Sequence, residues 1–171
     1  MKPIKTLYIV RHAKSSWDHP GLGDDQRPLL EKGRKRTKYV IDYFLKKKIK
    51  PDLIISSHAV RAFETARIFA IGLNYPEDNI IVSKGMYHGD LDNLYNYFFD
   101  LSDDLESLMM VGHNPTFTYF ANKFLDKTID NLPTSGVVCI EFETDKWEEV
   151  INAEKKTKFV ISPKMLRERK R

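Results

Sequence analysis

The stretch Leu7-Tyr8-Ile9-Val10-Arg11-His12-Ala13 is the most informative part of this 171-residue chain, because a short apolar run ends there in a guanidinium and an imidazole. Apolar runs of this length with polar boundaries are typical of buried strands. Two more apolar runs end in the same way, one before Ser56-Ser57-His58-Ala59-Val60-Arg61-Ala62 and one before Gly112-His113-Asn114-Pro115. The sequence therefore places cationic or imidazole side chains after three strands.

Segments of strand length alternate with longer segments of helical period, which predicts an α/β fold, a three-layer α/β/α sandwich around a mostly parallel sheet. Strands are predicted over Lys5–Val10, Asp52–Ser56, Asn79–Ser83 and Leu105–Val111, and helical segments over Leu29–Lys47, Val60–Ala70, Leu91–Phe99 and Thr116–Leu125. Near the C-terminus, Gly136–Phe142 and Trp147–Ile151 flank a turn at Asp145. This pattern predicts a terminal hairpin and an antiparallel edge strand.

Composition bounds the size and class of the protein. With 42% apolar residues the chain can bury one core, so we expect one domain over residues 1–153 and a basic tail over residues 154–171. Cys139 is the one cysteine, which excludes a disulfide within the chain. No apolar run is long enough for a signal-peptide core or a bilayer span. These features predict a cytoplasmic protein with no membrane partner.

The positive charge of the chain comes from its C-terminal end. The last 18 residues contain eight Lys or Arg against two Glu and so carry +6, which leaves −2 on the rest of a chain whose total is +4. Such a tail is usually solvated and weakly ordered. Nucleic acid is therefore the less favoured partner, although RNA or membrane-surface binding by the tail stays an alternative.

The three strand-end motifs point to one anion-binding pocket. Ligands of parallel α/β sheets bind at the carboxyl ends of the strands, where Arg11, His12, Arg61 and His113 are all expected. The planar fork of arginine suits the oxygens of a phosphoryl group. The sequence shows no carboxylate cluster or histidine spacing of a metal site and no glycine-rich nucleotide loop, so we expect neither a metal nor a cofactor.

The chain resembles the histidine phosphatase superfamily, which includes the cofactor-dependent phosphoglycerate mutases. Three features carry the resemblance, between about Leu7 and Phe142: the strand ending in Arg11-His12-Ala13, Arg61 within Ser-x-Ala-x-Arg-Ala, and Gly112-His113-Asn114-Pro115. Its SixA-like branch of small phosphohistidine phosphatases is similar in the alanine after the Arg-His pair, the segment Arg27-Pro28-Leu29-x-x-x-Gly33, the Gly-His-Asn-Pro loop and the short length. The resemblance implies a phosphoglycerate mutase-like fold.

The resemblance also implies roles for the motif residues. His12 would attack phosphorus as a neutral imidazole and form a phosphohistidine that water hydrolyses, so its pKa cannot be raised far. Arg11 and Arg61 would bind the non-bridging oxygens of the transition state, and His113 would donate to the same oxygens. Asn114, Ser57 and Asp18 are secondary candidates for substrate binding. The alternatives are surface ion pairs for the two arginines and a helix cap for His113.

One departure from the mutase pattern bears on the substrate. Larger members place a glutamate after the third strand as a general acid, whereas Lys84-Gly85-Met86-Tyr87-His88-Gly89-Asp90 contains none. His88 or Asp90 could replace it, although a solvated loop and a helix N-cap explain them equally simply. Without a strong acid, the site favours labile substrates such as phosphohistidine or an acyl phosphate.

Several functions stay open at this point. The favoured one is a phosphatase that acts through His12 on a phosphorylated protein or a small phosphorylated substrate. A small-molecule phosphomonoesterase or a mutase-like enzyme would use the same pocket, and a non-catalytic phosphate-binding or phosphoprotein-binding module would keep the same binding groups. The oligomeric state does not follow from the sequence, although a C-terminal hairpin would leave an edge strand.

Overall fold

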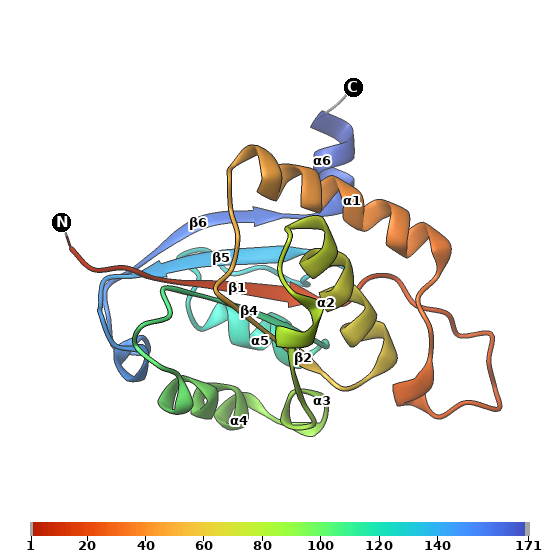
Figure 1. Cartoon of the computed structure of the whole chain (residues 1–171), viewed down its shortest axis with the longest axis horizontal. Coiled ribbons are helices and arrows are strands. Elements are labelled where there is room, and N and C mark those ends of the chain that lie inside the picture. The colour runs from red at the N-terminus through yellow and green to blue at the C-terminus, as the bar shows by residue number, and fades with distance from the viewer. Residues whose placement is uncertain (1, 170–171) are drawn as a thin grey trace.

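A computed structural model describes residues 2–169, and a mixed six-stranded sheet in the order β3-β2-β4-β1-β5-β6 forms its centre (Figure 1). The strands are β1 (Lys5–Arg11), β2 (Leu53–Ser57), β3 (Ile81–Ser83), β4 (Ser107–Gly112), β5 (Val137–Phe142) and β6 (Lys155–Ile161). The first four are parallel, while β5 is antiparallel to both β1 and β6. This arrangement confirms the predicted mostly parallel sheet with antiparallel C-terminal strands.

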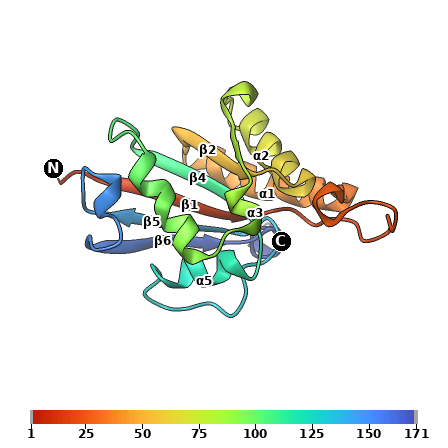
Figure 2. The ribbon, with the colours of Figure 1, turned by 90° about the horizontal axis from the view of Figure 1, so that it is seen from below.

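Helices cover both faces of the sheet. The α-helices are α1 (Glu31–Lys46), α2 (Val60–Gly72), α3 (Gly85–His88), α4 (Leu91–Asn96), α5 (Thr116–Asn122) and α6 (Pro163–Arg169), and the 3₁₀ turns are η1 (Asp24–Gln26), η2 (Glu77–Asn79), η3 (Tyr97–Asp100) and η4 (Trp147–Glu149). In Figure 1, α1 and α6 lie above the sheet and α4 lies below it. Figure 2 shows the second face, crossed by α3 and α4.

Alternating side chains of the strands fill two separate cores. On β1, Leu7 and Ile9 pack into the core shared with α4 and α5, whereas Tyr8 and Val10 pack into the core shared with α1, α2 and α6. Because both faces are covered, β1 reads as a continuous apolar run instead of an alternating one. The middle of the sheet is therefore rigid at the point where its strands end in polar residues.

The main elements confirm the predicted ones within a few residues, with one exception near the C-terminus. The stretch predicted as the second hairpin strand, Trp147–Ile151, contains the turn η4 instead, so that prediction is wrong. Trp147 is fully buried, stacks on Phe98 with ring centroids 6.1 Å apart, and donates its indole N–H to the carbonyl of Leu105. These contacts hold the residue against the sheet end, where an extended strand could not bury it.

Residues 155–169 are ordered, although a solvated tail is predicted over residues 154–171, of which the last two lie outside the described residues. Lys155–Ile161 pairs with β5 as the edge strand β6, and α6 packs on α1. Lysines alternate along β6 on its exposed side, while Ile161 and Leu166 are buried. Edge strands commonly carry lysines in this way, since the charge discourages pairing with other chains. The net charge alone therefore gave no sign of the edge strand β6 and the helix α6.

Within residues 2–169, no helix is both long enough and apolar enough to cross a bilayer.

Candidate active site

A cleft of about 690 Å³ opens at the carboxyl ends of β1, β2 and β4. Arg11 and His12 enter it from the end of β1, Arg61 from the first turn of α2, and His113 from the loop after β4. All four predicted core residues of the site therefore line one cavity, although β1 and β2 are separated in the sheet by β4. The main-chain N–H of His12 donates to the carbonyl of Gly112, which ties two of these loops together.

In the ring of His12, one nitrogen is hydrogen-bonded to the main chain and the other keeps a free lone pair. Its Nδ1 lies 2.7 Å from the carbonyl oxygen of Ala13, so Nδ1 carries the proton and donates, and Nε2 keeps its lone pair. Burial, with the nearby Arg61 and Arg11, lowers the pKa of His12 to about 4. The imidazole is therefore neutral at physiological pH, as a nucleophile requires.

His113 has the opposite arrangement. Its Nε2 lies 2.8 Å from Ser57 Oγ, and that oxygen accepts the main-chain N–H of Ala59. The serine hydroxyl therefore donates to Nε2, which places the imidazole proton on Nδ1, a buried atom without a partner among the described residues. Burial first, then His12 and Arg61, lowers the pKa of His113 to about 3. Ser57 is buried behind His113, outside the cleft lining, and acts by fixing this tautomer.

The two predicted arginines each keep one unpaired group. Arg11 donates from Nη1 to the carbonyl of Leu132, and Arg61 donates from Nη1 to the carbonyl of Asp24. The Nε atoms of both are buried without a partner among the described residues. Burial also lowers the pKa of Arg11, since its charge is partly desolvated. Unsatisfied buried donors are rare in proteins, and an oxyanion is the kind of group that such donors can bind.

Three further residues of the site, Asp24, Arg27 and Tyr87, are absent from the predicted site. The Asp24 carboxylate accepts from Arg61 Nη2 at 2.9 Å, from Arg27 Nε at 3.0 Å and from the hydroxyl of Tyr87. The hydrogen bond from Tyr87, then those from the two arginines, hold the pKa of Asp24 well below its usual range. Arg27 also stacks on the ring of Trp17, which is largely exposed at the cleft. The Arg27-Pro28-Leu29 motif was the one signal that pointed here.

The secondary candidates take different positions. The amide of Asn114 lines the cleft but is fully used within the protein: its nitrogen donates to Asn131 and Leu132, and its oxygen accepts from Thr118. Asn114 therefore shapes the loop that carries His113. Asp18 is exposed on the rim of the cleft.

The two candidate acids do not line the cleft. Asp90 caps α4, since its side chain accepts the N–H of Asn93 in a capping box, which confirms the N-cap alternative. His88 is exposed and packs edge-on against Tyr87. Of the described carboxylates only Asp18 and Asp24 line the cleft, and Asp24 stays ionised. The arrangement therefore supplies a neutral nucleophile and several oxyanion donors, with no glutamate beside them.

The comparisons with known proteins agree with this geometry. A family model of the histidine phosphatase superfamily (branch 1) matches residues 7–87. An uncharacterized chloroplastic protein of Arabidopsis thaliana is 28% identical over 153 residues, which are 85% of this chain and 70% of that protein.

Solved structures share the fold over almost the whole chain. The protein histidine phosphatase SixA, in a complex with tungstate, superposes with a TM-score of 0.80 at 20% identity and covers 94% of this chain and 99% of its own. Phosphoglycerate mutase from Bacillus anthracis superposes with a TM-score of 0.65 at 16% identity and covers 99% and 98% of the two chains. The family model over residues 7–87 and the fold shared with these structures make the chain similar to the histidine phosphatase superfamily in the part that carries Arg11, His12 and Arg61.

Proposed function

We propose that this protein is a phosphatase that transfers a phosphoryl group from a labile phosphorylated substrate, foremost phosphohistidine, to His12 and then to water. The observation that carries the proposal is the state of His12. Its Nδ1 is tied to the carbonyl of Ala13, its pKa is lowered to about 4, and its Nε2 lone pair is in a cleft lined by arginines. SixA, which has the same fold, was solved with tungstate, a tetrahedral oxyanion like phosphate.

In the first step, the lone pair of His12 Nε2 forms a bond to phosphorus while the bond from phosphorus to the leaving nitrogen breaks. The electron pair of that bond stays on the leaving nitrogen, and a phosphohistidine that is protonated on its other ring nitrogen departs as neutral imidazole. Charge on the three non-bridging oxygens is bound by Arg11, Arg61 and the Nδ1–H of His113. In the second step, a water oxygen attacks phosphorus, the Nε2–P bond breaks, and the water proton leaves with the phosphate. His12 then has its lone pair back.

The lack of a placed acid supports the choice of substrate. When phosphoserine is the substrate, the serine side chain leaves as an alkoxide and needs a proton from the protein. The imidazole of phosphohistidine is a much better leaving group. Among the described residues that line the cleft, the two carboxylates are an exposed rim residue, Asp18, and a salt-bridged one, Asp24. The lowered pKa of Asp24 is the opposite of the raised pKa that a carboxyl needs as a general acid.

The test compares wild type with His12→Ala on a phosphohistidine peptide and on a phosphoserine peptide. We expect phosphate release from the phosphohistidine peptide alone, no release by His12→Ala, and an alkali-stable, acid-labile phosphoryl group on wild-type protein after rapid quenching. His19→Ala is the matched control, because His19 is exposed and lies outside the cleft lining.

The other outcomes separate the alternatives. Release by folded His12→Ala contradicts the covalent mechanism. Equal release from both peptides means that the protein supplies an acid and is a broader phosphomonoesterase. Phosphate binding without any release identifies a non-catalytic phosphate-binding module.

A further inference from the structure

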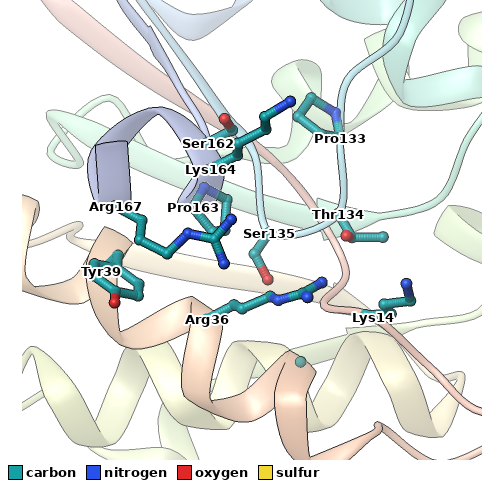
Figure 3. Close-up of a pocket in the computed structure, with 11 residues that line it drawn as sticks. Lys14, Arg36, Tyr39, Pro133, Thr134, Ser135, Ser162, Pro163, Lys164 and Arg167 are labelled. Carbon is teal, nitrogen blue, oxygen red and sulfur yellow. The ribbon is translucent and has the colours of Figure 1, made fainter. Parts of the chain in front are cut away.

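A second cavity, of about 410 Å³, lies between α1, α6 and the loop Pro133–Ser135, next to the catalytic cleft. We call it the α1–α6 groove. Four of its lining residues are cationic: Lys14, Arg36, Lys164 and Arg167. In Figure 3 the guanidinium groups of Arg36 and Arg167 point into the same space from the two helices, with the hydroxyl of Ser135 between them. The element that was expected to be a loose tail therefore forms one wall of the groove.

The positive charge of the α1–α6 groove is not neutralised by nearby carboxylates. None of its lining residues is acidic, and within residues 2–169 no carboxylate lies within 4.0 Å of its four cationic groups. Lys32 and Arg36 also lower the pKa of Lys14 by repulsion. Cations that are gathered without partners form a surface that attracts anions.

The α1–α6 groove is continuous with the catalytic cleft. Lys14, Arg36 and Thr134 line both cavities, and Lys14 follows His12 by two residues. In the other direction Lys32, Lys35 and Lys38 line a further depression on α1 with Arg36 and Arg167, and Asp42 is the acidic residue of that lining. One extended ligand can therefore present a phosphoryl group to His12 and further anions to this surface.

We propose that the α1–α6 groove binds carboxylate groups of an acidic polypeptide whose phosphorylated side chain is in the catalytic cleft. The inference rests on the proposed function and adds the class of substrate to it. The cationic positions of α1 run from Lys32 to Lys38, about 10 Å at 1.5 Å per helical residue. Such a surface suits a chain with several spaced charges better than one compact anion. An extended peptide covers this distance with about three residues, at roughly 3.3 Å each.

The experiment uses two peptides that carry a non-hydrolysable phosphohistidine analogue and differ only at positions three to six residues on each side of it, which are Glu in one and Gln in the other. Binding to wild type is measured by calorimetry. We expect the Glu peptide to bind about five- to tenfold more tightly, the gain typical of two exposed ion pairs, with the difference shrinking as salt is added.

The variants locate the effect. In Lys164→Gln/Arg167→Gln, whose residues line the groove and not the catalytic cleft, we expect the ratio of affinities to fall below about twofold. Lys46→Gln/Arg169→Gln is the control, with the same charge change on exposed positions of the same two helices outside the lining of either cavity; it should keep the wild-type ratio.

Several results would overturn the inference. These are equal binding of the two peptides by wild type, a preference for Glu that survives in Lys164→Gln/Arg167→Gln, or a loss that also occurs in the control. An RNA oligonucleotide that binds wild type but not the groove variant, with both peptides bound equally, would reassign the groove to nucleic acid.

Hydrolysis of the matching phosphohistidine peptides is measured separately. A failure to hydrolyse both, with the ratio of affinities intact, would therefore contradict the proposed function and leave the acidic preference established.

Discussion

His12 and His113 are neighbours, with ring centroids 5.3 Å apart, but their protons lie on different nitrogens. The carbonyl oxygen of Ala13 accepts a hydrogen bond from Nδ1–H of His12, and the hydroxyl of Ser57 donates a hydrogen bond to Nε2 of His113. One ring therefore offers a lone pair to the cleft and the other an N–H. This division of roles depends on both rings staying neutral, which their burial ensures.

The pH dependence follows from these lowered pKa values. Protonation removes the lone pair of His12 as the pH falls through about 4, so turnover at saturating substrate should stay flat from pH 8 to pH 5.5 and decline below pH 5. An ordinary histidine, with a pKa near 6.5, would give a decline over the upper range instead. NMR titration of the imidazole resonances checks the assignment, with His12→Gln identifying the signal. A midpoint above 6 for His12 would contradict the structure.

Ser57→Ala tests whether the serine sets the tautomer of His113. The change leaves Nε2 of His113 buried without a hydrogen-bond partner, so the tautomer with the proton on Nδ1 is disfavoured by about 1–3 kcal/mol. Because that tautomer supplies the donor to the phosphoryl oxygens, we expect roughly a ten- to hundredfold loss in kcat. Ser56→Ala is a matched control, because Ser56 is equally buried and bonds only to the carbonyl of Ser57. NMR should show His113 shifting toward the other tautomer in Ser57→Ala alone. Equal losses in the two variants would indicate a general packing effect.

At the scale of single elements, the start of α1 is set by its close approach to the loop after β1. A Cβ at Gly33 would lie 2.4 Å from the carbonyl oxygen of Lys14, and that oxygen accepts the N–H of Leu30. The same loop carries Lys14 into both the cleft around His12 and the α1–α6 groove. The position of α1 and the shape of the two cavities are therefore linked.

Gly33→Ala should destabilise the protein even though alanine favours helices over glycine. The clash is with backbone, so the loop must shift, at a cost of about 1–3 kcal/mol of unfolding free energy. Gly21→Ala, where no atom lies within 4 Å of the added Cβ, should leave stability nearly unchanged. Urea unfolding of both variants measures the difference. An unchanged midpoint for Gly33→Ala would mean that the loop adapts freely.

The elements that sequence predicted well are those whose signals are local. Strand ends after apolar runs brought Arg11, His12, Arg61 and His113 to one cleft, since parallel topology leaves few other arrangements. Asp24 and Tyr87 were missed because they come from segments without periodicity, and only the path of those segments brings them to Arg61. Such contacts are tertiary and have no local signature.

For the whole molecule, the C-terminal segment completes the fold. The strand β6 pairs along β5, and α6 places Leu166 in the core beneath α1. The charge of this segment suggested a tail, because its eight lysines and arginines outnumber its apolar residues. Its three apolar residues Phe159, Val160 and Ile161 were the signal for a strand. The number of charged residues reflects the exposed side of a strand, and it does not predict whether the other side is buried.

Truncation after Glu154 should therefore abolish cooperative folding, because it exposes the edge of β5 and one side of the core. We expect loss of a sharp thermal transition in circular dichroism, together with aggregation. Lys156→Gln/Lys158→Gln in the full chain removes charge and keeps the strand, so its Tm should change by only a few degrees, as is usual for exposed charges. A truncated protein that melts like wild type would show that β6 and α6 are dispensable.

The contact between Asp24 and Arg61 has a consequence for which anions can enter. An anion that binds Nη2 of Arg61 must exchange with a carboxylate that is tethered in place and bonded to Arg61, Arg27 and Tyr87. Chloride or acetate brings one charge, no more than Asp24 already supplies, and pays the full entropy of association. A phosphoryl dianion brings more charge and more acceptor oxygens. At Arg61 the carboxylate of Asp24 therefore competes with the common monovalent anions of the solvent.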